Sequence, residues 1–325
     1  MGQGGMGQRN DGSAGRSGRA FGKGGGALLQ WTWNSAWTLL VLGNLFWAGN
    51  IIVGRVILGS VPPISLSFWR WTGAFAVAFF FAWPHLRKDW KVLLVHWRIM
   101  LALAATGIAF FNTAAYVGLA GTTALNVLLL QSCLPLIVTI WAFVLFKDQP
   151  SNWQLCAVVI SLAGVAFVAV HGSPEALLRL RFYRADLWIL ASAVIYGIYI
   201  VLLRRQPDVH PLSFMQAAMG LGVCMIAPLY LRELSQGVRI SDDWRNFAGI
   251  GYMAVFPSFI SYLLFNRGVQ LIGGARAGQS THMIPVAGSI MAVLFLGESL
   301  HVYHLVGVVL IGAGIVLAQL KAPAR

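Results

Sequence analysis

The sequence contains few charged residues, and acidic residues are the scarcest. Only 10% of its 325 residues are Asp, Glu, Lys or Arg, whereas 58% are hydrophobic. A soluble domain carries about 25% charged residues, so this chain lacks the polar surface that a water-soluble protein needs. Cysteines are also scarce, and Cys133, Cys156 and Cys224 all fall within apolar runs. That placement argues against a disulfide framework or a metal site, and the composition excludes a single soluble domain.

The chain consists instead of successive apolar runs, each close to the roughly 20 residues that cross a bilayer as a helix. The fold class predicted is therefore an all-α integral membrane protein with ten transmembrane helices. Residues 1–27 differ from the rest, because they are rich in Gly and Arg and are expected to be disordered. The ten predicted spans are 36–57, 64–83, 98–119, 123–146, 153–171, 186–203, 212–231, 247–268, 276–297 and 302–320.

The positions of Lys and Arg predict the orientation in the membrane. If the N-terminus lies inside, about two thirds of the 23 basic residues fall on inner segments, as the positive-inside rule requires. The basic stretch 179–184 would then lie outside and argues weakly for the opposite orientation. The prediction is a multi-pass protein of the cell inner (cytoplasmic) membrane with both termini in the cytoplasm.

The second half of the chain repeats the first. Pro135 in LLLQSCLPLIV corresponds to Pro285 in QSTHMIPVAGS, and at the same spacing Asp148 corresponds to Glu298. Each copy holds five predicted spans, and because five is odd, the second copy is expected to be inverted relative to the first. Inverted units can exchange conformations and open a midplane site to each side in turn. The predicted parts are a tail at 1–27, a first repeat at 28–171 and a second repeat at 172–325.

Three segments resemble the EamA-type repeats of the drug/metabolite transporter (DMT) superfamily: LFWAGNIIVGRVI, ALNVLLLQSCLPLIVTIWAFVLFKD and MIPVAGSIMAVLFLGESLHVYHLVGVVLIGAGIVL. The most specific part is Pro285, followed by Leu-Gly-Glu at 296–298 and the glycine-containing run 307–314. The first half departs from the pattern, with Lys147 and Asp148 where that family usually has Gly-Glu. The resemblance implies two inverted five-helix repeats around a central cavity, and export of amino acids, other metabolites or drugs.

Arg70, within SLSFWRWTGAF in the second span, is the strongest candidate for a functional residue. A guanidinium in the bilayer core needs a partner or an anion. Arg70 has no counterpart in the second half, where Met219 stands at the equivalent position. The sequence leaves two interpretations open: Arg70 faces a substrate carboxylate, or it lies near the span end and reaches interfacial water or a backbone carbonyl.

Other polar and aromatic side chains within the spans are spaced to share one face of a helix, and they would line a central cavity. Each of them could instead form an interhelical hydrogen bond. His282 titrates near neutral pH and would couple transport to protons, donate to a substrate carboxylate, or bond a neighbouring helix. The complete set of substrate-binding candidates is Asn44, Trp47, Asn50, Arg70, Asn112, Tyr116, Tyr196, Tyr199, Ser258, Ser261, Tyr262, Gln279 and His282.

Asp148 and Glu298 lie at equivalent span ends. Their symmetry favours a structural role, either capping a neighbouring helix or pairing with Lys or Arg. Glu298, His301 and His304 also have a spacing typical of metal ligands, but the first half does not repeat that set. No catalytic residue, metal or cofactor is therefore expected.

The predicted function is a secondary transporter or facilitator that exports amino acids or related small metabolites by alternating access. Its expected partners are a small-molecule substrate and the lipid bilayer, with protons as the candidate coupling ion, no nucleic acid, and a monomeric or homodimeric state. One alternative is a multidrug or cation exporter, but the first four spans contain no Asp or Glu before Asp148. A second alternative is a polytopic membrane enzyme. The substrate and the coupling ion stay open.

Overall fold

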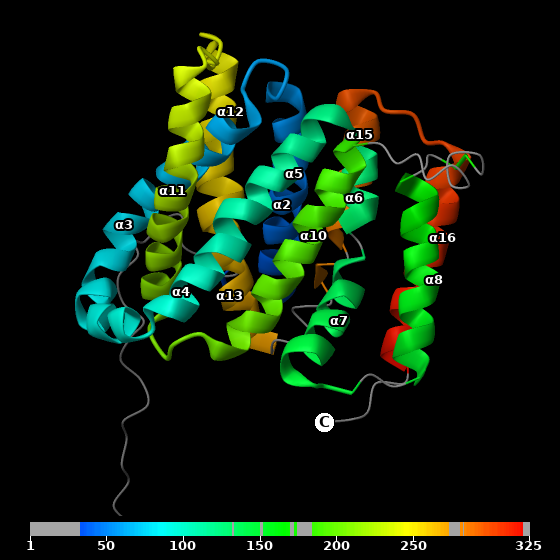
Figure 1. Cartoon of the computed structure of the whole chain (residues 1–325), viewed down its shortest axis with the longest axis horizontal. Coiled ribbons are helices and arrows are strands. Elements are labelled where there is room, and N and C mark those ends of the chain that lie inside the picture. The colour runs from blue at the N-terminus through cyan, green and yellow to red at the C-terminus, as the bar shows by residue number, and fades with distance from the viewer. Residues whose placement is uncertain are drawn as a thin grey trace, which may run out of the picture.

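The computed structural model describes residues 33–131, 133–149, 152–169, 172–173, 184–272, 280–281 and 283–320. Within these ranges the regular secondary structure is entirely helical, and the helices form one bundle (Figure 1). The all-α fold class predicted from the composition is therefore confirmed. The predicted tail at 1–27 lies outside the described residues.

Among the described residues of its first half, the chain forms seven α-helices and one π turn. They are α2 (Ala36–Ile57), α3 (Pro63–Val95), α4 (Trp97–Ala104), η1 (Ala105–Ala109), α5 (Phe110–Gly121), α6 (Ala124–Gln131), α7 (Leu134–Phe146) and α8 (Asn152–Ala169). Proline positions explain two of the boundaries, because proline fits the first turn of a helix but cannot donate a hydrogen bond within one. Pro63 opens α3, and a proline in the first turn of α7 accompanies the break after α6.

The second half follows a similar order. Its elements are α10 (Arg184–Leu202), η2 (Leu203–Arg205), α11 (Pro211–Ser235), α12 (Trp244–Val255), η3 (Phe256–Ile260), α13 (Ser261–Ile272), α15 (Met283–Leu296) and α16 (Val302–Leu320). The π turns η1 and η3 stand at equivalent positions of the two halves. A π turn leaves backbone carbonyls without their usual helical donors, and such turns are frequent at functional sites.

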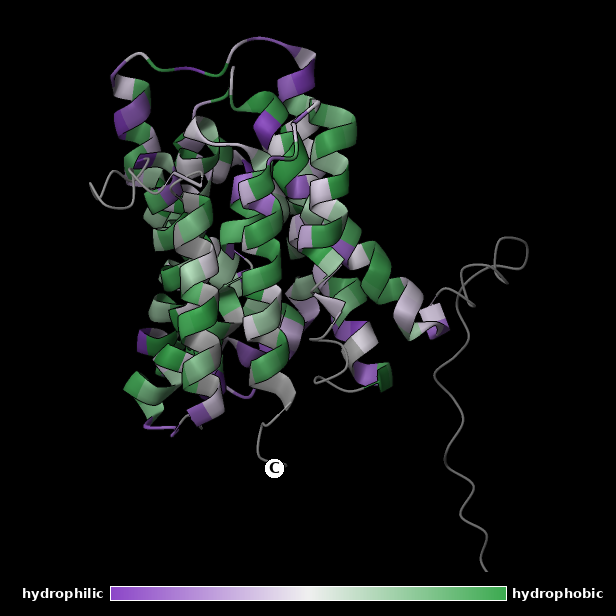
Figure 2. Ribbon diagram, turned by 90° about the vertical axis from the view of Figure 1, so that its right-hand side faces the viewer, coloured by the Kyte–Doolittle hydropathy of each residue, from purple (hydrophilic) through white to green (hydrophobic). Residues whose placement is uncertain are grey.

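Six described helical segments are long and apolar enough to cross a membrane, and α6 with α7, bent by 42° between them, would add a seventh. Helices α15 and α16 contain shorter apolar stretches. Hydrophobic residues dominate the middle of the helices, and hydrophilic ones gather toward the ends and loops (Figure 2). The chain is therefore a multi-pass membrane protein, and the count of ten spans stays a prediction.

Contacts at one end of the bundle show that the repeats are inverted. Arg55, in the last turn of α2, donates from Nη1 to the carbonyl oxygen of Leu119 at 3.1 Å. Thr122, which follows α5, donates from Oγ1 at 2.6 Å to Asp186, in the first turn of α10. Helix α2 thus ends where its equivalent, α10, begins. This end of the bundle lies at the top of Figure 1.

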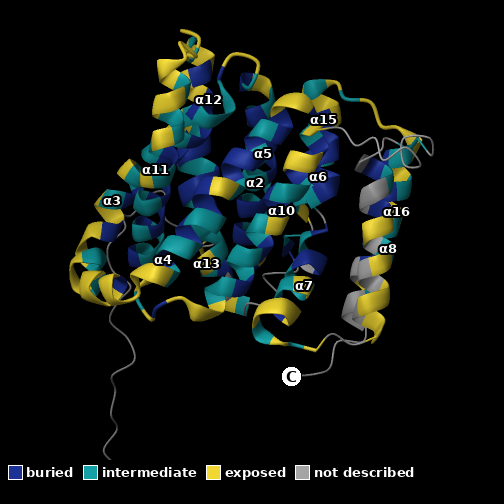
Figure 3. Cartoon of the chain, in the orientation of Figure 1, coloured by how far each residue is buried: buried dark blue, intermediate teal, exposed yellow. Residues whose placement is uncertain are grey.

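Packing between the halves follows the same symmetry. Helix α2 packs against α13, and its equivalent α10 packs against α5. The equivalent helices α3 and α11 pack against each other, as do α8 and α16, which lie together at one side of the bundle (Figure 1). Buried residues concentrate along α2, α5 and α6 in the middle of the bundle (Figure 3). Buried polar side chains occur on these helices as well, namely Asn44 on α2, Asn112 and Thr113 on α5, and Asn126 on α6.

Candidate functional site

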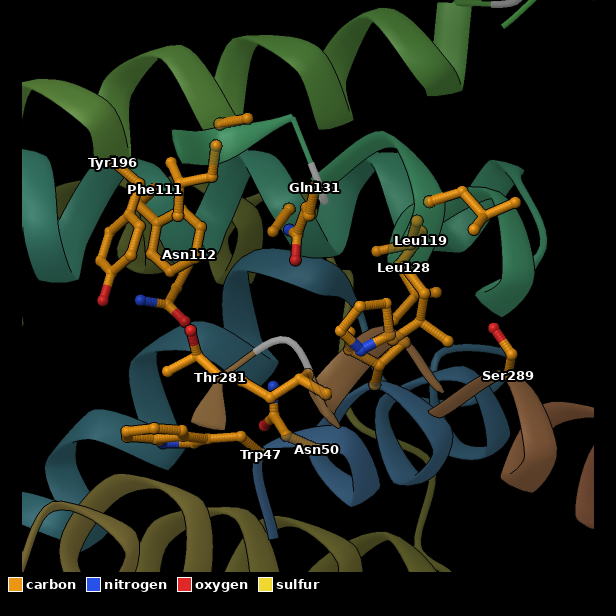
Figure 4. Close-up of a pocket in the computed structure, with 18 of the residues that line it drawn as sticks. Trp47, Asn50, Phe111, Asn112, Leu119, Leu128, Gln131, Tyr196, Thr281 and Ser289 are labelled. Carbon is orange, nitrogen blue, oxygen red and sulfur yellow. The ribbon is translucent and has the colours of Figure 1, made fainter. Parts of the chain in front are cut away.

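A cavity of about 730 Å³ lies among the central helices. Its lining residues come from both repeats, on α2, α3, η1, α5, α6, α7, α10, α13, α15 and α16. Figure 4 shows side chains from α2, α5 and α10 converging on this space. The predicted candidates that line it are Trp47, Asn50, Arg70, Asn112, Tyr116, Tyr196 and Tyr262.

Arg70 is only 4% exposed and joins three helical elements. Its Nε donates to Ser258 Oγ in η3 at 2.7 Å, and its Nη1 donates to Asn112 Oδ1 on α5 at 2.9 Å. Nη1 also donates to the Tyr116 hydroxyl on α5. The interpretation in which Arg70 reaches interfacial water is therefore wrong, because its partners are buried side chains of neighbouring helices.

The partners of Arg70 are themselves oriented by further hydrogen bonds. Asn112 Nδ2 donates to the carbonyl oxygens of Gly107 and Ile108, both within the π turn η1, which directs Oδ1 toward Arg70. The Tyr116 hydroxyl donates to Asn50 Oδ1 on α2 at 3.1 Å. A chain of hydrogen bonds thus runs from the guanidinium of Arg70 to the amide of Asn50 along the cavity.

The positive charge of Arg70 has no acidic partner in the described part of the chain. Its guanidinium carbon lies 4.9 Å from the ring centre of Trp71 and 5.8 Å from that of Tyr116. A cation–π contact stabilises a desolvated cation by about 2 kcal/mol or more. Such contacts do not neutralise it, so a buried positive charge faces the cavity.

Aromatic side chains form much of the remaining wall. Trp47 donates its indole N–H to the carbonyl oxygen of Pro257 in η3 at 2.9 Å and meets Tyr262 edge to face at 5.6 Å. Phe111 stacks on Tyr196 with 4.2 Å between ring centres, and the two rings lie side by side in Figure 4. The cavity therefore combines one cationic group with flat apolar surfaces.

Four predicted candidates are not among the lining residues. Asn44 donates to the backbone oxygen and the hydroxyl of Ser280, at 2.8 and 3.0 Å. Ser261 donates to the Gly43 carbonyl oxygen, and Ser258 accepts from Arg70 while donating to the Met253 carbonyl oxygen. The ring of Tyr199 packs against Gly107. Gln279 and His282 lie outside the described residues.

Other lining residues were not predicted. Trp71 follows Arg70 directly, Phe111 precedes Asn112, and Gln131 lies at the end of α6. Thr281 adds a hydroxyl group from the residues that precede α15 (Figure 4). The polar ones among them carried a signal, because each is a polar residue within an apolar run. The aromatic ones did not, because aromatic residues are common throughout these spans.

The predicted structural roles of Asp148 and Glu298 are confirmed. The Glu298 carboxylate accepts from the backbone N–H groups of Ala124 and Leu125, at 2.8 and 2.9 Å, and so caps α6. Asp148 forms an ion pair with Arg204 at 2.7 Å. No group of three potential metal ligands occurs among the described residues.

Comparisons with known proteins place the chain in a family. A model of the EamA-like transporter family matches residues 34–170 and again 183–320. The chain belongs to this family. Its resemblance to the DMT superfamily, inferred from the pattern around Pro285, is thereby confirmed. The two matched ranges also correspond to the two inverted halves of the bundle.

Curated relatives of this EamA-like protein are also transporters. The uncharacterized transporter YyaM of Bacillus subtilis (strain 168) is 28% identical over 291 residues, covering 86% of this chain and 92% of the relative. A probable terminal-alkyne amino-acid exporter of Streptantibioticus cattleyicolor is 25% identical over 232 residues, which cover 70% of this chain and 74% of the relative. A solved crystal structure, 18% identical, matches 88% of this chain and 96% of its own with a TM-score of 0.56, which supports the fold.

Proposed function

We propose that this EamA-like protein is a secondary transporter or facilitator that exports amino acids or related small metabolites bearing a carboxylate. It would do so across the cytoplasmic membrane, with both termini in the cytoplasm. The observation that carries this proposal is the unneutralised guanidinium of Arg70 at the wall of a central cavity. A charge in the membrane interior is expensive, and in transporters it marks a substrate or ion pathway.

The two inverted halves support an alternating-access mechanism. Arg70, Asn112 and Tyr116 come from the first repeat and Ser258 from the second, so relative motion of the repeats would change the site itself. Inverted-repeat transporters place their substrate at such an interface. Aromatic walls such as Trp47 and Tyr196 would hold the apolar part of a substrate.

The relative from Streptantibioticus cattleyicolor, named as a probable amino-acid exporter, favours the same substrate class. A cation exporter is less consistent with the site, because the residues that line the cavity include an arginine and no acidic residue. An enzymatic activity has no supporting cluster of metal ligands among the described residues. We therefore retain amino-acid or metabolite export as the proposal.

Counterflow in proteoliposomes tests the proposal without assuming a coupling ion. Vesicles loaded with an unlabelled amino acid should take up the same labelled species, and Arg70→Gln should abolish the uptake while folding, checked by near-UV circular dichroism, is kept. Arg232→Gln, which removes an exposed arginine at the end of α11, serves as the matched control. Uptake that is unchanged in Arg70→Gln, or absent for every carboxylate tested with folded wild-type protein, would contradict the proposal.

A further inference from the structure

We infer that the central cavity prefers monoanions over zwitterions: its substrates would carry one carboxylate and an apolar, often aromatic body, but no ammonium group. This inference rests on the proposed function and makes its substrate class narrower. It places 2-hydroxy acids, 2-oxo acids and N-acylated amino acids ahead of free amino acids. Three observations lead to it, namely the hydrogen-bonding capacity left in the site, the charges around it, and the chemistry of its walls.

Around Arg70, the side-chain oxygens that could accept a hydrogen bond already do so, whereas some N–H donors have no partner among the described residues. We call this part of the cavity, formed by Arg70, Asn50, Asn112 and Tyr116, its polar end. Ser258 Oγ, Asn112 Oδ1 and the Tyr116 oxygen each accept from Arg70, and Asn50 Oδ1 accepts from Tyr116. Neither Nη2 of Arg70 nor Nδ2 of Asn50 donates a hydrogen bond in the described part of the chain. A guanidinium and an amide can donate more bonds than these, so a ligand must supply acceptors.

Trp71 adds a third donor to this end. It lines the same cavity, is 2% exposed, and its indole N–H has no hydrogen-bond partner among the described residues. A buried donor without a partner destabilises the protein unless a ligand or water accepts from it. A carboxylate has two oxygens with about four acceptor sites, which suits a cluster of donors better than a neutral carbonyl does.

An ammonium group finds no opposite charge among the described residues of this site. The residues that line the cavity include no Asp or Glu. An ammonium would therefore lose its hydration beside the positive charge of Arg70, without an ion pair to compensate. Desolvation without a counter-charge disfavours a cation strongly. The same argument disfavours free amines even more than zwitterions.

The walls away from Arg70 complete the description of the substrate. Trp47, Phe111 and Tyr196 present aromatic faces, and the remaining wall includes aliphatic residues such as Leu128 and Ile284. A cavity of about 730 Å³ lies within the usual range for small-molecule sites. An apolar group of the size of a phenyl ring or larger would fill it better than a short polar side chain would.

Three ligands that share a phenyl group test the charge preference directly. They are L-phenylalanine, a zwitterion; L-3-phenyllactate, in which a hydroxyl replaces the ammonium; and 2-phenylethylamine, which lacks the carboxylate. Proteoliposomes are assayed by exchange of labelled phenyllactate and, separately, of labelled phenylalanine. We expect phenyllactate to inhibit exchange at a concentration at least about tenfold lower than phenylalanine, and the amine not to compete.

The outcomes separate this inference from the proposed function. If phenylalanine exchanges and inhibits as strongly as phenyllactate, the proposed function holds and the monoanion preference is wrong. If the amine is the strongest inhibitor, or none of the three is exchanged or bound by folded protein, both are wrong. Binding of each ligand is measured in parallel by ligand-induced shifts of the unfolding temperature, which do not depend on transport.

Asn50→Asp provides a nearly isosteric test in the protein itself. The new carboxylate can still accept from the Tyr116 hydroxyl, but the substitution removes the free amide N–H donor of Asn50 and adds a negative charge. We expect inhibition by phenyllactate to weaken by about tenfold or more, and the order of phenyllactate and phenylalanine to reverse. Asn50→Ala, which removes the donor without adding charge, should weaken phenyllactate but keep the order. An unchanged order in Asn50→Asp would overturn the inference.

Discussion

Asp148 and Glu298 occupy equivalent positions of the two repeats, but their carboxylates have different partners, so neutralising them should have unequal effects. Glu298→Gln keeps one acceptor oxygen and turns an NH₂ group toward a backbone N–H of Ala124 or Leu125. The loss of one charge-assisted hydrogen bond should lower the free energy of unfolding by about 1.5–3 kcal/mol. The lost negative charge at the start of α6 adds about 0.3–1 kcal/mol.

Asp148→Asn removes an ion pair whose side chains are 30% and 46% exposed. Solvent-exposed pairs contribute about 0–1 kcal/mol, so this variant should be nearly as stable as the wild type. Thermal unfolding of the purified proteins, compared at one scan rate, measures the difference, at about 2–4 °C for each kcal/mol. A decrease in Asp148→Asn equal to or larger than that in Glu298→Gln would refute the reasoning from helix capping.

Three further predictions concern helix packing, a buried hydrogen bond and pH. Gly307→Leu should separate α8 from α16 and lower the unfolding temperature, because a Cβ at Gly307 would already clash with Val168 of α8. Gly251→Ala, at a position where an added Cβ meets nothing, should not lower it. In chemical unfolding, Thr122→Val should lower the free energy of unfolding by about 1–3 kcal/mol, because valine cannot donate a hydrogen bond to the buried carboxylate of Asp186. Thr122→Ser keeps that donor and should lower it much less. Desolvation lowers the pKa of His210, whose neutral Nδ1 accepts from the backbone N–H of Leu212 in the first turn of α11. The contribution of His210 to stability is therefore present above its unfolded pKa of about 6.5 and is lost as the pH falls through the lower folded pKa. In His210→Asn, which keeps a capping acceptor, the unfolding temperature should depend less on pH from about 7.5 downward.

The helices were largely predictable because apolar runs of bilayer length leave few alternatives. The predicted ranges 36–57 and 302–320 coincide with α2 and α16. The predicted span 123–146 is instead two helices, because the bend near residue 133 depends on local backbone geometry rather than hydropathy. Helix α3 continues to residue 95, beyond the predicted 83, because hydropathy marks the bilayer core and not the end of a helix.

The candidate site was predictable only in part. Arg70 was identified because a charge within an apolar run is rare, but its partner Ser258 lies 188 residues away in the chain, and no spacing rule connects them. Asn44 and Asn50 lie on one helix and look alike in the sequence, and only the structure shows that Asn50 lines the cavity while Asn44 bonds Ser280. Buried Asp186 was missed because it lies in the first turn of its span.

The most direct test of the central claim asks whether Arg70 and the carboxylate of the substrate interact. Binding of a transported carboxylic acid and of its amide is measured to the wild type and to Arg70→Gln, which together form a double-mutant cycle. We expect the wild type to prefer the acid by at least about tenfold, equal to about 1.4 kcal/mol, and Arg70→Gln to lose this preference. An equal preference for the acid in both proteins would contradict the claim.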